Sequence, residues 1–238
     1  PKYLLFLENA FPYMDNYNYH KGMKGIIQEL KVLLKTKSIG TNSDRALLLD
    51  FQATLETKPE KAIKLEKDAL AQIENITADN ARLVSNLHAN LGGLYRMNGY
   101  PDLAREHMEK SISLLDQFNL LHINDSIPQI ANYAMFLTEQ QEPERGISEL
   151  QKLSGIIKEY HSDDCLDYAK VQETLGTIYL MTANLPQAKT HFKRAFKIYE
   201  KIWADEPEMI EAKYQEIQEL YPQIGFFIGK NLSGLLTK

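Results

Sequence analysis

The chain has 238 residues, 44% of them hydrophobic, and a formal net charge of −5 at pH 7. This content is enough for a buried core, but no stretch approaches the roughly 18–20 apolar residues of a membrane span, so we expect no membrane insertion. Basic and acidic residues are mixed along the chain, which argues against direct binding of nucleic acid. The single cysteine, Cys165, cannot form an internal disulfide, and we therefore expect a reducing, cytoplasmic location.

Small side chains recur with a fixed period. They stand 42 residues apart at Gly92, Ala134 and Gly176, and a second small residue follows each after 12 residues, at Ala104, Gly146 and Ala188. A period of this size indicates stacked supersecondary units. Because antiparallel helices approach to about 8–10 Å only where their side chains are short, these residues are predicted helix crossings.

Taken in chain order, the pattern predicts one all-α solenoid domain over residues 1–238. The expected repeats cover approximately 1–41, 42–83, 84–125, 126–167 and 168–206, with a terminal half-repeat over 207–238. Each complete unit reads as two helices. Proline is tolerated in a first helical turn, where its missing N–H is not needed, and it is expected to start the second helices at Pro59, Pro101, Pro143 and Pro186.

The repeats resemble a known family. The set Leu91, Gly92 and Tyr95, followed by Ala104 and Met108, is similar to the tetratricopeptide repeat consensus. The fifth unit matches it at Leu175, Gly176, Tyr179, Ala188, Phe192 and Ala195. The period of 42 instead of 34, with an acidic-proline turn at 205–208, resembles the kinesin light-chain type. The resemblance covers about residues 42–221 and implies a right-handed superhelix of about five hairpins plus a C-terminal helix.

Chemistry-bearing motifs are missing from the sequence. There is no phosphate-binding glycine loop, no His-Glu-x-x-His motif and no cysteine pair, so we expect no catalytic residues, no metal, no cofactor and no enzymatic activity. His88 and His191 are interpreted as half-buried packing residues. Cys165 follows two acidic residues, which disfavour a reactive thiolate, and Ser162 or Asp163 is predicted as the N-cap of a helix beginning near Leu166.

The resemblance implies a ligand-binding face on the first helix of each hairpin. The residues expected there lie off the core-facing stripe: Asn86, Asn90, Arg96, Met97, Asn132, Met135, Glu139, Lys170, Glu173, Thr177 and Met181. Asn90 and Asn132 are 42 residues apart and can donate to and accept from a peptide backbone. Bridging between adjacent repeats is the alternative for both. The methionines offer adaptable apolar contact, or else inter-repeat packing.

The predicted function is that of a scaffold or adaptor holding a peptide or protein segment in the concave groove. The alternative is a ligand-sensing module of a larger bacterial regulator, either a peptide-responsive transcription factor or a switch ATPase. A carboxylate clamp is not expected, because Ala89, Gly93, Ala131 and Thr174 occupy the corresponding lines. The apolar segment 224–229 would cap the solenoid or mediate a homodimer. The aromatic segment 11–20 would be an N-terminal cap or a partner-binding lip.

Overall fold

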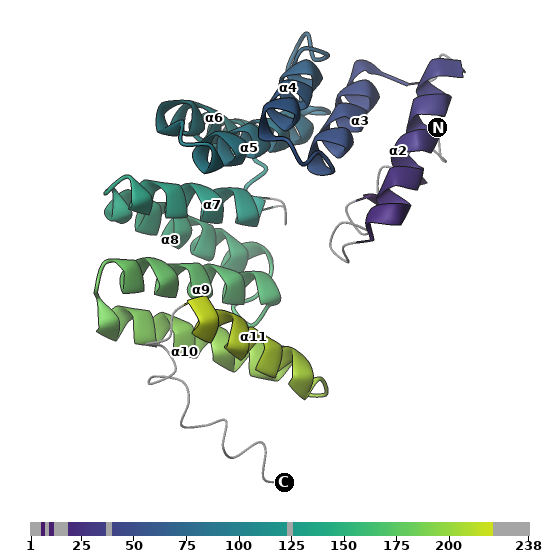
Figure 1. Cartoon of the computed structure of the whole chain (residues 1–238). Helices are drawn as coiled ribbons and strands as arrows, with labels where there is room; N and C mark the ends of the chain where they lie inside the picture. Colours follow the sequence, from purple (N-terminus) through teal and green to yellow (C-terminus); the bar gives the residue numbers. More distant parts are fainter. Residues whose placement is uncertain (1–5, 8–9, 12–18, 37–39, 123–125, 221–238) are drawn as a thin grey trace. The chain divides into compact units, whose positions relative to one another are not determined.

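The computed structural model describes residues 6–7, 10–11, 19–36, 40–122 and 126–220 (Figure 1). Its regular structure within those ranges is helical throughout, so the predicted all-α class is confirmed. The helices are α2 (His20–Thr36), α3 (Asn42–Thr54), α4 (Pro59–Leu70), α5 (Ala81–Met97), α6 (Pro101–Gln117), α7 (Ser126–Glu139), α8 (Pro143–Tyr160), α9 (Leu166–Met181), α10 (Leu185–Ile202) and α11 (Pro207–Leu220). None of these described helices has the length and apolar character needed to cross a membrane.

The chain divides into two compact units, residues 1–120 and 121–238. In the first unit α3 and α4 form one hairpin, α5 and α6 form the next, and α4 packs against α5. In the second unit α7 pairs with α8, α9 pairs with α10, and α8 packs against α9. The first helices of successive hairpins also touch, α3 with α5 and α7 with α9. A single domain over 1–238 stays a prediction.

The predicted helix crossings are confirmed at atomic distances. A Cβ added to Gly92 would lie 2.5 Å from the Met108 side chain, and one added to Gly176 would lie 2.9 Å from the Phe192 ring. A Cβ on Gly146 would lie 2.6 Å from the carbonyl oxygen of Ala134. These gaps are below van der Waals contact, so each crossing needs its small residue.

The predicted starts of the second helices are confirmed in all four described hairpins, whereas one predicted N-cap is not. The second helices α4, α6, α8 and α10 carry proline in their first turn, as predicted. The predicted N-cap of α9 is wrong. Cys165, in extended conformation, caps the helix, and its Sγ accepts a hydrogen bond from the Tyr168 backbone N–H at 3.4 Å. Ser162 stands too early and accepts from Asp164 instead, at 3.1 Å.

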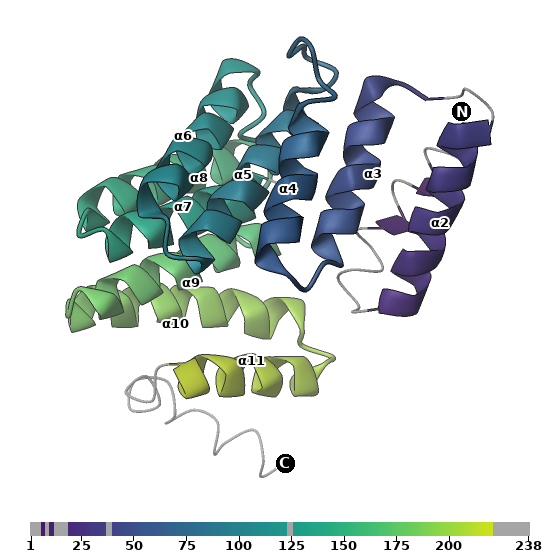
Figure 2. The same cartoon turned by 45° about the horizontal axis from the view of Figure 1, so that its top comes forward.

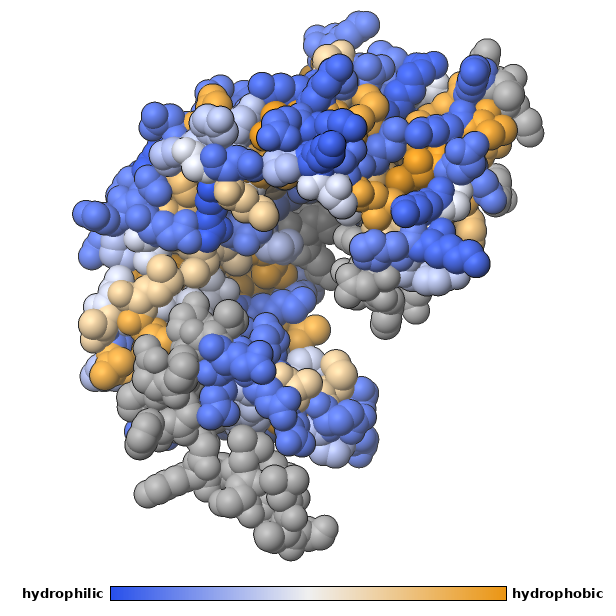
Figure 3. Space-filling view, in the orientation of Figure 1, coloured by the Kyte–Doolittle hydropathy of each residue, from blue (hydrophilic) through white to orange (hydrophobic). Residues whose placement is uncertain are grey.

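The start of the first unit is held by an apolar cluster. Phe11 stacks on Phe51 with ring centroids 3.8 Å apart, and Met23 and Leu30 of α2 are each 1% exposed. Figure 3 shows apolar surface beside hydrophilic side chains over α2 and α3. Phe11 therefore packs inward. The rest of the predicted aromatic segment up to residue 18, and the whole of segment 224–229, lie outside the described residues.

Candidate protein-binding face

Two adjacent first helices of the second unit, α7 and α9, carry most of the predicted site. Asn132 and Glu139 on α7 are exposed and Met135 is half-buried. On α9, Lys170 is exposed and Met181 has 44% of its surface exposed. Thr177 is only 9% exposed, so it offers little surface to a ligand.

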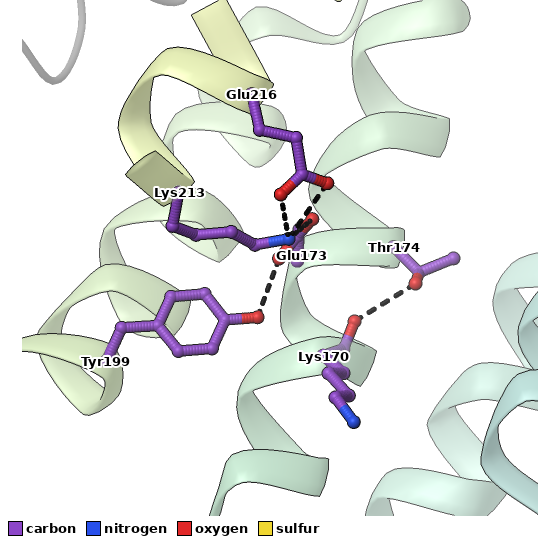
Figure 4. A network of polar contacts seen from close by, with 6 residues as sticks. All are labelled: Lys170, Glu173, Thr174, Tyr199, Lys213 and Glu216. Atoms are coloured by element: carbon purple, nitrogen blue, oxygen red, sulfur yellow. Dashed lines mark hydrogen bonds and ion pairs between the residues drawn. The ribbon is translucent and has the colours of Figure 1, made fainter. Parts of the chain in front are cut away.

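Glu173, another predicted site residue on α9, is occupied by contacts within the unit (Figure 4). The Tyr199 hydroxyl of α10 donates to its Oε2 at 2.6 Å, and Lys213 Nζ of α11 lies 3.0 Å from its Oε1. Lys213 also pairs with Glu216 at 3.0 Å. Burial, together with Glu173, raises the pKa of Tyr199. Burial alone would lower the pKa of Lys213, but the carboxylates of Glu173 and Glu216 outweigh it, so the pKa is raised. Glu173 therefore ties α9 to the two following helices.

The first unit presents its predicted residues on α5. Met97 is 84% exposed, whereas Asn86 and Arg96 are half-buried. Asn90 is exposed, yet its Nδ2 donates to Asp50 Oδ1 at 2.8 Å and to Glu66 Oε1 at 3.3 Å. Asn90 thus bridges α5 to the preceding hairpin, which is one of the two roles expected for it. Its role in ligand binding stays a prediction.

Glu66, Asp50 and Asn90 form a cluster, here the polar trio, that the sequence interpretation missed. Glu66 is 2% exposed and its Oε2 has no hydrogen-bond partner among the described residues. Burial, followed by the neighbouring Asp50 carboxylate, raises the pKa of Glu66 from 4.5 to about 10. The side chain is therefore protonated at neutral pH. Its carboxyl joins α4 to α5 through Asn90, which also donates to Asp50 of α3.

The repeat itself contains the signal that would have identified Glu66. Steps of 42 residues from Glu66 lead to Met108, Leu150 and Phe192, which are 3%, 0% and 2% exposed. Met108 and Phe192 are the side chains that face the crossing glycines. The second repeat therefore places a carboxyl where three others bury an apolar side chain.

A second repeated cluster involves histidine. His88 Nδ1 lies 2.9 Å from His107 Nδ1, and 84 residues on, Gln172 Oε1 lies 2.9 Å from His191 Nδ1. Since an amide oxygen only accepts, His191 donates through Nδ1. In the His88–His107 pair one Nδ1 donates and the other accepts, according to the tautomers of the two rings. Both rings at this position stack on a tyrosine, His107 at a centroid distance of 5.5 Å and His191 at 5.2 Å.

The histidine rings are held neutral by their surroundings. Burial, then His107 and Lys110, lowers the pKa of His88 to about 4. Burial likewise lowers the pKa of His107 and of His191. Across the residues that the structure describes, no group of three or more His, Cys, Asp or Glu side chains could hold a metal ion.

Comparisons with known proteins agree with the helical-hairpin fold. The sequence model of the tetratricopeptide repeat matches residues 126–201. BtubC (BKLC) from P. vanneervenii has a similar structure, with a TM-score of 0.56 and 17% identity over 83% of this chain and 72% of that one. A second similar structure consists of nearly identical repeats of the tetratricopeptide type, assigned to a kinesin light chain of Podosopora anserina. Its TM-score is 0.60, with 13% identity over 82% of this chain and 96% of that one.

A third similar structure is the MamA protein, with a TM-score of 0.50 and 16% identity over 84% of this chain and 95% of that one. No curated protein matches the sequence. Repeats of this architecture generally present extended surfaces for binding partners. Residues 126–201 therefore match the tetratricopeptide repeat, and the chain has the helical-hairpin fold seen in these solved repeat structures, a kinesin light-chain-like array among them.

Proposed function

We propose that the chain is a scaffold or adaptor that binds a peptide or protein segment across α7 and α9. The observation that carries this proposal is the packing of the two first helices side by side, with predicted site residues still at the surface. Asn132, Met135 and Glu139 on α7, with Lys170 and Met181 on α9, are the residues that would contact the segment.

The chemistry of this face suits a bound segment of mixed character. Asn132 can donate to and accept from an extended backbone, as a peptide needs. Met135 and Met181 have flexible thioether side chains that adapt to different apolar partners. Glu139 and Lys170 have opposite charges, which would set the orientation of a charged peptide. In the first unit Asn86, Arg96 and Met97 stay candidates for further contacts.

The test is a selection of random displayed peptides against the intact chain. Binding of the selected peptides is then measured by fluorescence polarisation. The variant Asn132→Ala/Met135→Ala should weaken binding by about tenfold or more, since truncating a residue at the centre of an interface can cost about 2 kcal/mol or more. The control is Lys193→Ala/Lys197→Ala on the second helix α10, where both lysines are exposed.

The two variants separate the α7–α9 face from the rest of the surface. Selective loss in the α7 variant, with unchanged helical content by circular dichroism, supports the proposal. If the α10 control weakens the peptides equally, or if the α7 variant binds them as the wild type does, the segment binds elsewhere and the proposal is wrong.

A further inference from the structure

A pocket of about 580 Å³ lies in the first unit between α2 and α4, beside the C-terminal end of α3. Figure 2 shows α3 between these two helices. The floor of the pocket is apolar, with Ile27 from α2, Leu55 after α3 and Leu65 from α4. This volume falls within the range of about 300–1,000 Å³ that is typical of ligand pockets. It has room for several side chains of a partner.

Three lysines stand around this floor, Lys24 on α2 and Lys61 and Lys64 on α4. All three are exposed, and none forms an ion pair with a described residue. Glu56 and Asp68 also line the pocket, so its lining keeps a positive balance of one charge. Lys21, Lys31 and Lys35 also belong to α2 but do not line the pocket. We call the pocket with Lys24, Lys61 and Lys64 the lysine pocket.

A segment with complementary charge occurs in the C-terminal part of the same sequence. Asp205, Glu206 and Glu208 form an exposed acidic turn into α11, and Met209 beside them is 43% exposed. These three carboxylates are without an ion pair in the part of the chain that the structure describes. The segment therefore combines clustered negative charge with an exposed apolar side chain. We call it the acidic turn.

We propose that the chain associates with a second copy of itself, with the acidic turn of one copy seated in the lysine pocket of the other. The carboxylates meet Lys24, Lys61 and Lys64, and Met209 covers the apolar floor. The pocket and the turn consist of different residues, so each contact joins unlike surfaces of the two copies. A nucleic acid fits less well, because a phosphate backbone has no apolar group for the floor.

Sedimentation velocity of the intact chain over a wide concentration range tests the proposal. We expect the mean mass to rise with concentration at low salt. It should fall back at high salt, as the screening length drops from about 10 Å at 0.1 M to about 3 Å at 1 M. Lys61→Glu/Lys64→Glu should weaken association by about tenfold or more, since like charges then face each other. Lys61→Gln/Lys64→Gln should weaken it less, and it serves as a second variant if the first does not fold.

Two further arms make the result specific. Lys31→Glu/Lys35→Glu changes the net charge equally on α2 outside the pocket, and it should leave association within about twofold of wild type. When the variant Asp205→Lys/Glu208→Lys is measured by itself, it should not associate. Mixed with the pocket variant, it should restore a complex, because the turn of the pocket variant and the pocket of the turn variant are both native.

The proposal is wrong if the wild type stays monomeric at every concentration, if the α2 control weakens association as much as the pocket variant, or if the mixture forms no complex. It is also wrong if the lysine pocket instead binds a labelled single-stranded oligonucleotide and Lys61→Glu/Lys64→Glu loses that binding.

Discussion

Replacing Glu66 with glutamine should stabilise the protein at neutral pH. Glu66 is 2% exposed, and burial raises its pKa to about 10, so the folded state holds a proton that the unfolded chain releases above its ordinary pKa of 4.5. The folded state therefore binds more protons than the unfolded state between these values, and stability falls as the pH rises through this interval. Glutamine has the shape of the protonated acid and carries no ionisable group.

The expected magnitude follows from the interval between pH 4.5 and pH 7. At about 1.4 kcal/mol per pH unit, keeping Glu66 protonated at pH 7 costs about 3 kcal/mol. Glu66→Gln should recover a stabilisation of this order at pH 7 and almost nothing near pH 4.5. It keeps the contact with Asn90, because its amide oxygen can accept from Asn90 as Glu66 Oε1 does.

The assay is urea unfolding followed by far-ultraviolet circular dichroism at a series of pH values. Circular dichroism is preferred because the single tryptophan, Trp203, belongs to the second unit and would not report on the polar trio. The control is Glu60→Gln, which removes a formal charge from an exposed position in the same helix. If Glu66→Gln has the same pH slope as the wild type, or if the control changes the slope as much, the reasoning is refuted.

Three further changes test other parts of the structure. Ala104→Leu should lower the free energy of unfolding by about 1–3 kcal/mol in thermal melts, because Ala104 is fully buried at a crossing, and an unchanged melt would contradict that packing. His88→Gln should keep a hydrogen bond with His107. The wild type should lose about 1–2 kcal/mol of stability, after allowance for the partial exposure of His88, as the pH falls from 6.5 to about 4, and the variant should not. Equal melting of the variant and the wild type in acid would contradict this. Tyr199→Phe should cost about 2 kcal/mol in urea unfolding by removing the charged hydrogen bond to Glu173, and no loss would contradict its role.

The hairpins could be predicted from sequence because the information that forms them is local. Gly92 and Ala104 are close in sequence and meet within one hairpin, and proline starts a helix through its own backbone geometry. The period of 42 then copies this local information along the chain. Cys165 shows the limit of such local prediction. Ser162 and Asp163 have better hydrogen-bond acceptors and were the expected caps, but Cys165 caps α9.

The candidate site was harder to predict because each position has two possible neighbours. Asn90 and Glu173 were expected off the core-facing stripe, and both contact another hairpin or a following helix. Helical periodicity tells which face a residue occupies, but not whether that face meets solvent or the next repeat. The answer depends on partners 24 to 40 residues away in sequence, such as Glu66 and Asp50 for Asn90.

The repeats supply their own reference for what each position requires. Met108, Leu150 and Phe192 show that an apolar side chain fills the position of Glu66, so the hairpin has no general need for a carboxyl there. A buried acid that costs about 3 kcal/mol at pH 7 is a departure that packing alone does not explain. Departures from a local rule concentrate at functional or strained sites in proteins. The second repeat is therefore a further place, besides the α7–α9 face, where a role specific to this chain should be sought, and its α4 helix also lines the lysine pocket.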